Sequence, residues 1–199
     1  MRAIQGATIA LSLVLATAAS AQSTQRIRGD IVSVDGPKLT VRTRSGDLAS
    51  VALAEPYKVS AVVRTTPQAI VQGGYVGAAS MPQPDGTERA LEVLVFPESG
   101  RGSGEGHYAW DLRPGSMMTN ATVAQVESVD NGRRMTLKYK DGEKTLIVPP
   151  DVPIVTFEPG TPEMLRAGAH VMLNARVQPD GSLAASGVAV GKDGLVPPM

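Results

Sequence analysis

The sequence contains no cysteine and few aromatic side chains. None of its 199 residues is cysteine, and Phe, Trp and Tyr together make up 4% of the chain. A chain without cysteine has no disulfide framework, no thiolate metal site and no lipidated cysteine anchor. Packing and backbone pairing must therefore hold this fold together.

Clustered positive charge is also lacking. The chain carries 19 Lys and Arg residues against 19 Asp and Glu, and the two signs alternate along the sequence. Nucleic-acid binding depends on clustered Lys and Arg side chains that neutralise phosphates. This charge pattern offers no such cluster, and no nucleic-acid partner is expected.

Long hydrophobic runs are absent, and the one apolar run lies near the N-terminus. Arg2 is followed by apolar residues from 7 to about 18 and by the small residues Ala-Ser-Ala at 19–21. This is the pattern of a secretory signal peptide, with cleavage after Ala21. The run is shorter than the ~20 residues of a transmembrane helix. We expect a periplasmic protein without a transmembrane span in its mature chain.

The rest of the chain repeats itself at a spacing of about 95 residues. Several identities recur at this spacing, which indicates a tandem duplication. The clearest matches are Ser33–Asp35 with Ser128–Asp130, Thr66-Pro67 with Thr161-Pro162, Gly73 with Gly168, and Gln83–Gly86 with Gln178–Gly181.

Each copy reads as a series of short strands. Segments such as KLTVRTR alternate apolar and polar side chains between turns rich in Gly and Pro, which is typical of half-buried antiparallel strands. A Thr-Pro pair then indicates the start of a short helix near Pro67 and near Pro162. The pattern predicts an all-β protein of two tandem OB-like, partly open barrels. Each barrel would have five or six strands and one short helix.

The expected domain boundaries follow from the repeat. After a signal peptide at 1–21, the first barrel would span 22–96 and the second 121–192. Between them lies a Gly-rich linker that continues into an aromatic and Met-rich segment, 97–120, and a tail follows at 193–199. Copies of this size bury little surface alone, so we expect the two barrels to pack on one another.

Several stretches also resemble a known family. The motif R-x-x-G-x-I-x-S-V-D-G beginning at Arg26, the stretch L-T-V-x-T and the later P-Q-x-D-G-T-x-R-A-L-E-V are similar to a family of exported bacterial OB-like domains of unknown function. The resemblance covers 26–96 well and the second copy more loosely. It implies the OB-like fold and export, and it implies no activity or set of functional residues.

The segment between the copies holds the chain's only Trp and one of its two His residues. Gly100, Gly102, Gly104 and Gly106 predict a mobile first part, 99–106, whereas bulky side chains from His107 onward predict an ordered second part. One interpretation is a plug that covers the groove between the barrels. The other is a ligand or partner site, whose candidate residues are His107, Tyr108, Trp110, Asp111, Met117, Met118 and Asn120.

The plug interpretation assigns roles to the segment's side chains. Tyr108 and Trp110 would cover the groove, and Asp111 would pair with Arg113 or cap a turn. The alternative is a copper-type metal site, because His and Met are ligands that suit copper. Its candidate ligands are His107, Met117 and Met118, with His170 and Met172 on one face of a later strand as a second candidate.

Catalytic signatures are sparse. Ser103, His107 and Asp111 occur in the order of a triad, but they lie on a Gly-rich loop without the strand–turn–helix that fixes a nucleophile. We therefore expect a non-catalytic binding or accessory module that needs no cofactor and has a protein or peptide partner in the periplasm. The alternative is a periplasmic, copper-handling protein.

Export makes a direct prediction about the N-terminus. If the signal peptide is cleaved after Ala21, the mature protein begins at Gln22. N-terminal sequencing of the protein made in a Gram-negative host checks this, and a mature chain that retains Met1 would contradict export by this route.

Overall fold

The computed structural model describes residues 23–129 and 132–198. The expected signal peptide, 1–21, lies outside these residues. The expected all-β class is confirmed, because β-strands dominate the described chain and its helical elements are 3-10 turns of three residues each. Within the described residues, no helix is long and apolar enough to cross a membrane.

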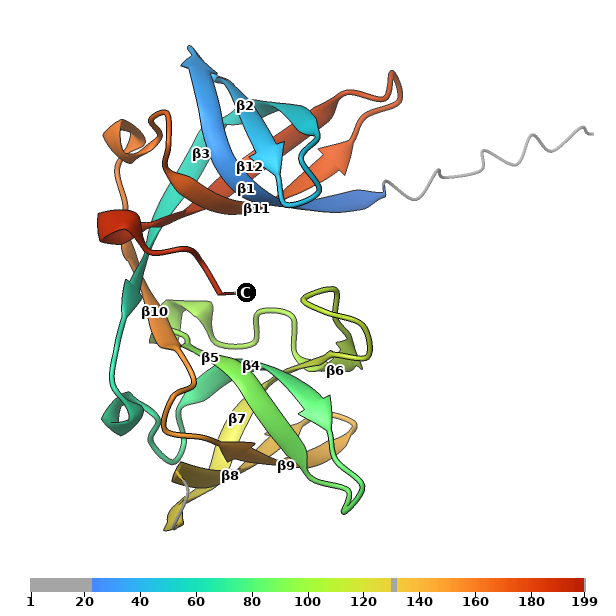
Figure 1. The fold of residues 1–199 in the computed structure, drawn as a ribbon, viewed down its shortest axis with the longest axis vertical. Helices are drawn as coiled ribbons and strands as arrows, with labels where there is room; N and C mark the ends of the chain where they lie inside the picture. Colours follow the sequence, from blue (N-terminus) through green and yellow to red (C-terminus); the bar gives the residue numbers. More distant parts are fainter. Residues whose placement is uncertain (1–22, 130–131, 199) are drawn as a thin grey trace, which may run out of the picture.

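Five strands close one barrel, drawn at the top of Figure 1. The ring runs β1–β2–β3–β12–β11 and returns to β1. Neighbouring strands are antiparallel except β3 and β12, which are parallel. The strands are β1 (Thr24–Asp35), β2 (Lys38–Thr43), β3 (Leu48–Arg64), β11 (His170–Val177) and β12 (Leu183–Gly191).

A second ring of five strands has the same order of connections. It runs β7–β8–β9–β5–β4 and returns to β7, and its parallel pair is β5 with β9. The strands are β4 (Tyr75–Pro82), β5 (Glu88–Val95), β7 (Met117–Val129), β8 (Gly132–Tyr139) and β9 (Gly142–Val148). We call the two rings the first and second barrel.

The rings do not follow the expected boundaries of two consecutive barrels, 22–96 and 121–192. The first barrel combines β1, β2 and β3 with β11 and β12 from the other end of the chain. The second combines β7, β8 and β9 with the earlier β4 and β5. A strand pair from either copy presents the same alternation of apolar side chains, so the sequence pattern does not determine which barrel it closes.

A two-stranded ribbon joins the barrels along one side (Figure 1). The second half of β3 continues past the first barrel, where Ser60–Arg64 pair antiparallel with β10 (Ile154–Pro159). β10 in turn pairs in parallel with the end of β5. Val62, Leu94 and Val155 are buried together where these strands meet. The ribbon therefore belongs to the hydrogen-bonded sheets of both barrels.

Each barrel has its own core, and a connecting segment contributes one apolar side chain to it. The alternate apolar side chains of the strands point inward, as Leu39 and Val51 do in the first barrel and Val93 and Leu137 in the second. The segments that connect the barrels also enter these cores. Ile70, after the turn η1 (Pro67–Ala69), packs in the second barrel, and Leu165, after η3 (Pro162–Met164), packs in the first.

The expected short helices are single 3-10 turns in the structure. Each begins at the expected proline, after Thr66 or Thr161, and neither threonine side chain caps its turn. The turn at Pro67 is followed at once by the β-branched Ile70 and Val71, and two glycines come after Gln72, which favours extended chain over a longer helix.

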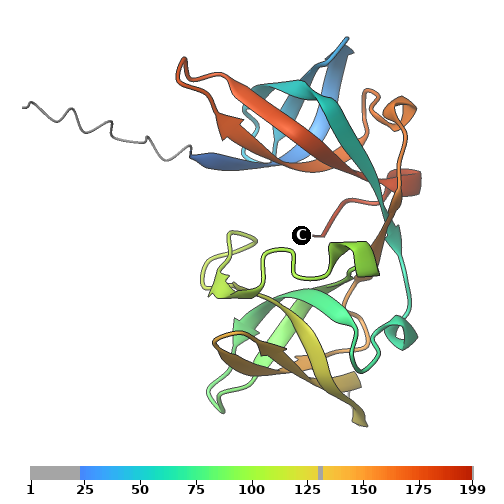
Figure 2. The ribbon, with the colours of Figure 1, turned by 180° about the vertical axis from the view of Figure 1, so that it is seen from behind.

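The C-terminal tail lies between the two barrels in both views (Figures 1 and 2). After the turn η4 (Lys192–Gly194), Leu195 packs against the cluster at the ribbon, and the carbonyl of Pro197 accepts a bond of 3.3 Å from Arg44. The barrels therefore face each other across space that is partly filled by the tail and by the segment after β5.

The exchanged strands can be tested with engineered disulfides, because the chain has no cysteine of its own. Ala52 and Ala184 are direct partners in the parallel pair of β3 and β12. Their separation, about 5 Å between neighbouring strands, suits a disulfide. The Ala52→Cys, Ala184→Cys variant should oxidise within one chain, as measured by peptide mapping.

The matched control is Ala52→Cys with Arg89→Cys. Position 89 precedes position 184 by one repeat length and would be the partner of Ala52 in a consecutive barrel, whereas Arg89 pairs with Ile147 in the second barrel. This variant should not form the intramolecular bond. The opposite result in both variants would show consecutive barrels.

Candidate functional site

The segment after β5 forms a small hairpin with β7. The turn η2 (Glu98–Gly100) comes first, and β6 (Gly106–Ala109) then pairs antiparallel with Met117–Asn120. The glycine stretch between them makes contacts, since the carbonyl of Ser103 accepts a bond from Tyr75 and that of Gly104 accepts one from Asn120. These bonds place the glycine stretch against the second barrel.

Strand alternation in this hairpin separates the predicted site residues. Direct partners in an antiparallel pair share a face, and the next pair along lies on the other face. Tyr108 is the partner of Met118, whereas His107 is the partner of Thr119. Met117 and Met118 therefore point to opposite faces. The hairpin presents Tyr108 and Met118 to the space between the barrels and directs His107 elsewhere.

A cavity of about 260 Å³ lies between the barrels, on the outer face of β4 and β5. Four of the seven candidate residues of the segment between the copies line it, namely Tyr108, Trp110, Met118 and Asn120. The first barrel contributes Arg26, Met172 and Asn174 to the wall. Leu94, Phe96 and Phe157 supply much of its apolar surface, so the cavity draws on both barrels, the ribbon and the hairpin.

Glu92 is the feature of this cavity that the sequence did not reveal. Its side chain lies on the same face of β5 as Leu94, is fully buried and has no hydrogen-bond partner for either oxygen. Burial raises the pKa of Glu92 to about 8. The Ala79 amide and the charge of Arg28 favour the ionised form, but neither makes a bond of normal geometry to the carboxyl.

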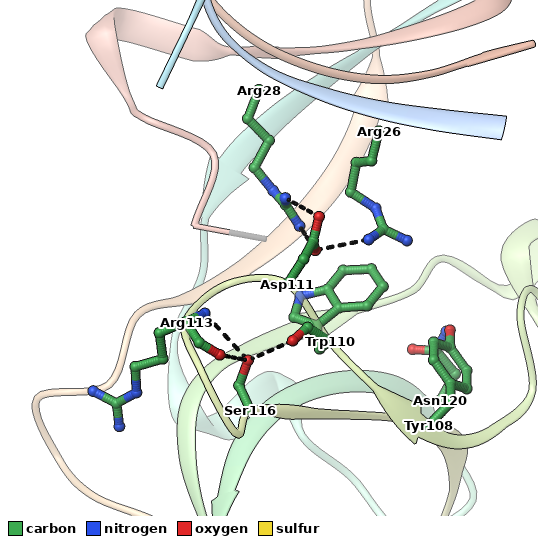
Figure 3. A network of polar contacts seen from close by, with 8 residues as sticks. All are labelled: Arg26, Arg28, Tyr108, Trp110, Asp111, Arg113, Ser116 and Asn120. Atoms are coloured by element: carbon green, nitrogen blue, oxygen red, sulfur yellow. Dashed lines mark hydrogen bonds and ion pairs between the residues drawn. The ribbon is translucent and has the colours of Figure 1, made fainter. Parts of the chain in front are cut away.

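Trp110 follows β6, is half-buried and lines the same cavity as Glu92. Its indole N–H is buried without a partner. The guanidinium of Arg26 lies over the ring, 3.6 Å from its centre, as in a cation–π contact. The backbone from Trp110 to Arg113 is held by Ser116, whose buried hydroxyl bridges the carbonyls of these two residues (Figure 3).

Asp111 ties the hairpin to the first barrel. The expected pairing with Arg113 is wrong, because Asp111 accepts bonds of 2.9 and 3.0 Å from Arg28 and one of 2.7 Å from Arg26 (Figure 3). The bond from Arg28 is the main cause that lowers the pKa of Asp111 to about 2. The two arginines are brought to one carboxylate because they lie on the same face of β1.

His107 belongs to a separate cluster in the second barrel. One ring nitrogen lies 2.9 Å from the hydroxyl of Thr119, and the other lies 3.4 Å from the buried carboxylate of Glu88. Glu88 also accepts a bond from the buried hydroxyl of Ser80, and Lys144 lies 3.9 Å away. Burial lowers the pKa of His107, while the charge of Glu88 opposes this effect.

The predicted copper ligands are not brought together. His107 contacts Glu88 and Thr119, Met117 is on its face of the hairpin, and Met118 faces the cavity on the other side. Among residues 23–129 and 132–198, no three His, Cys, Asp or Glu side chains gather as metal ligands do.

His170 and Met172, the second candidate pair of metal ligands, have different surroundings. His170 contacts Asp30, its direct partner on β1. Met172 lines the cavity together with Asn174, two positions further along β11. The shared face expected for these side chains therefore includes part of the cavity wall.

Comparison of the chain with protein-family models, with curated proteins and with solved structures found no match.

The raised pKa of Glu92 predicts a pH-dependent stability. As the pH rises from about 4.5 to about 8, the unfolded chain loses this proton while the folded chain keeps it, so the stability of the wild type should fall. Glu92→Gln removes this ionisation. The variant should match the wild type near pH 4 and exceed it by about 3 kcal/mol at pH 7 in urea unfolding.

Glu143→Gln is the control, since Glu143 is an exposed residue of the second barrel. Its stability should follow the wild-type curve at every pH. Parallel curves for wild type and Glu92→Gln would contradict the buried, protonated state of Glu92.

Proposed function

We propose that this chain is a non-catalytic binding module, exported to the periplasm, whose two OB-like barrels hold a small ligand between them. The observation that carries this proposal is the pair of buried polar groups in one cavity, the Glu92 carboxyl and the Trp110 indole N–H, for which the described protein supplies no partner.

Unpaired buried groups support a binding role because they are costly. Most buried polar groups in proteins are hydrogen-bonded, and each unpaired one costs about 1–3 kcal/mol. Two such groups beside Phe96 and Phe157 resemble a ligand site, which combines an apolar wall with a few placed polar groups. A bound molecule would provide both hydrogen-bond partners at once.

The barrel topology supports the OB-like class. Each ring has five strands. The turn between β3 and β4 sends Ile70 into the core of the second barrel, and the turn between β10 and β11 sends Leu165 into the core of the first. Membership of the exported OB-like family is part of the same proposal, on the residues from Arg26 to Phe96 that resemble it.

The polar clusters support binding over catalysis. The hydroxyl of Ser80 is buried and donates to Glu88, and the ring of His107 is engaged with Glu88 and Thr119. A nucleophile needs a base within hydrogen-bond reach and access to substrate. Ser103, His107 and Asp111, which occur in the sequence in the order of a triad, do not form one, since the carboxylate of Asp111 is held by an arginine of the first barrel.

The size of the cavity favours a small molecule over an extended peptide. About 260 Å³ corresponds to the liquid volume of roughly nine water molecules. The protein or peptide partner expected from the sequence could insert one side chain here, but the cavity does not follow an extended strand. The copper alternative has less support, because His107 and Met118 lie on opposite faces of the hairpin.

Native mass spectrometry tests the proposal on protein purified from the periplasm of the cells that produce it. The wild type should carry a small-molecule adduct. Asn174→Phe should lose it, since Asn174 is exposed at the cavity wall and a Phe ring there narrows the opening.

Arg176→Phe is the matched control. Arg176 is exposed, shares the face of β11 with Asn174 and does not line the cavity, so this variant should keep the adduct. An adduct retained in Asn174→Phe would place the ligand elsewhere, and no adduct in the wild type would remove the support for a resident small molecule.

A further inference from the structure

Resting on the proposed function, we propose that the ligand is a small carboxylate with an apolar body. Its carboxylate accepts hydrogen bonds from the Trp110 indole N–H and from the Glu92 carboxyl, and its body packs against Phe96 and Phe157, which line the same cavity.

The hydrogen-bonding groups of the cavity favour an acceptor. The indole N–H can only donate. The side-chain amide of Asn120 already donates to the carbonyl of Gly104 and to the hydroxyl of Tyr108. Among the described residues, the buried side-chain atoms without a partner are the Trp110 nitrogen, whose N–H donates, and the two oxygens of Glu92, one of which donates when it carries a proton.

The charges around the cavity favour an anion. Arg26 lines the wall and stacks on Trp110, and the nearly buried Arg28 lies close enough to Glu92 to favour its ionised form. Asp111 binds both arginines and so offsets part of their charge. The charged or titratable side chains that face Glu92 and its surroundings are Arg26 and Arg28 from β1, Arg44 from the turn after β2, and Tyr108 and Asp111 from the hairpin.

Protonation of Glu92 makes two carboxyl groups compatible in one cavity. Because burial keeps its pKa at about 8, Glu92 is mainly uncharged at neutral pH and can donate to a ligand oxygen. A cationic ligand could pair with ionised Glu92, but it would leave the indole N–H without an acceptor and would bring a positive charge toward Arg26 and Arg28.

The apolar wall accounts for the body of the ligand. Phe96 and Phe157 meet edge to face, with 6.2 Å between ring centres, and Leu94, Met118 and Met172 lie around them. Methionine side chains adapt to ligands of different outline. A phenyl or short alkyl group on the carboxylate suits this wall and the small volume of the cavity.

The test uses two probes that differ in the charge of the head group, 3-phenylpropionate and 3-phenylpropylamine. Isothermal titration calorimetry of the wild-type protein at pH 6 should show binding of the carboxylate at least tenfold tighter than of the amine. From pH 6 to pH 9 the affinity for the carboxylate should fall roughly tenfold, because the proton that Glu92 donates is lost above its pKa of about 8.

Two variants locate the interaction. Trp110→Phe keeps an aromatic ring but removes the N–H, and it should weaken carboxylate binding about tenfold at pH 6. Glu92→Gln keeps a donor and an acceptor that do not titrate, and it should abolish the fall in affinity between pH 6 and pH 9. Circular dichroism of each variant checks that the barrels are folded.

Tighter binding of the amine, or an unchanged affinity in Trp110→Phe, would overturn the carboxylate assignment. Such a result is distinguishable from failure of the proposed function, because the adduct found by native mass spectrometry and its loss in Asn174→Phe do not depend on the head group. An adduct whose mass fits a molecule without an acidic group would overturn the assignment in the same way.

Discussion

The antiparallel pairing of β3 with β10 is the contact on which the rest of this structure depends. In this pairing β3 continues past the first barrel to Arg64, so the chain reaches the second barrel before the start of β4. Those two strands then close the ring that begins with β7. Further along the chain, β10 runs antiparallel to β3 back toward the first barrel, where β11 and β12 close the ring.

This exchange makes the two barrels one covalent and hydrogen-bonded unit. Domain swapping between subunits is a known route to dimers, and here the equivalent exchange occurs within a single chain. The first barrel closes only with strands from both ends of the described chain, and the strands between them close the second barrel. The two chain crossings that this requires keep the facing surfaces of the barrels opposed. That opposition buries Glu92, which would otherwise lie on the outer face of β5.

The hairpin completes the wall of the cavity. Asp111 binds Arg26 and Arg28, and this ion pair holds Trp110 at the cavity wall between the barrels. The same alternation that points Tyr108 and Met118 into the cavity directs His107 to Glu88, so one short strand serves two separate clusters. The segment is therefore both a cover for the gap and a part of the candidate site.

Much of the candidate site was visible in the sequence. Tyr108, Trp110, Met118 and Asn120 stood out because bulky amphipathic side chains follow a glycine stretch. Glu92 did not stand out, since a polar residue between Leu91 and Val93 reads as the solvent side of a half-buried strand. The partner of Asp111 was also mistaken, because the nearby Arg113 is a neighbour in sequence and Arg28 is a neighbour only in space.

The sequence by itself determined the all-β class, the positions of most strands and the proline-started turns, because alternation, β-branching and turn residues act over a few neighbouring residues. Only the tertiary structure decided which strands close which barrel and what lies between the barrels. Two copies with the same alternation can pair within or across the repeat, and that choice depends on contacts such as β3 with β10, between residues nearly a hundred positions apart.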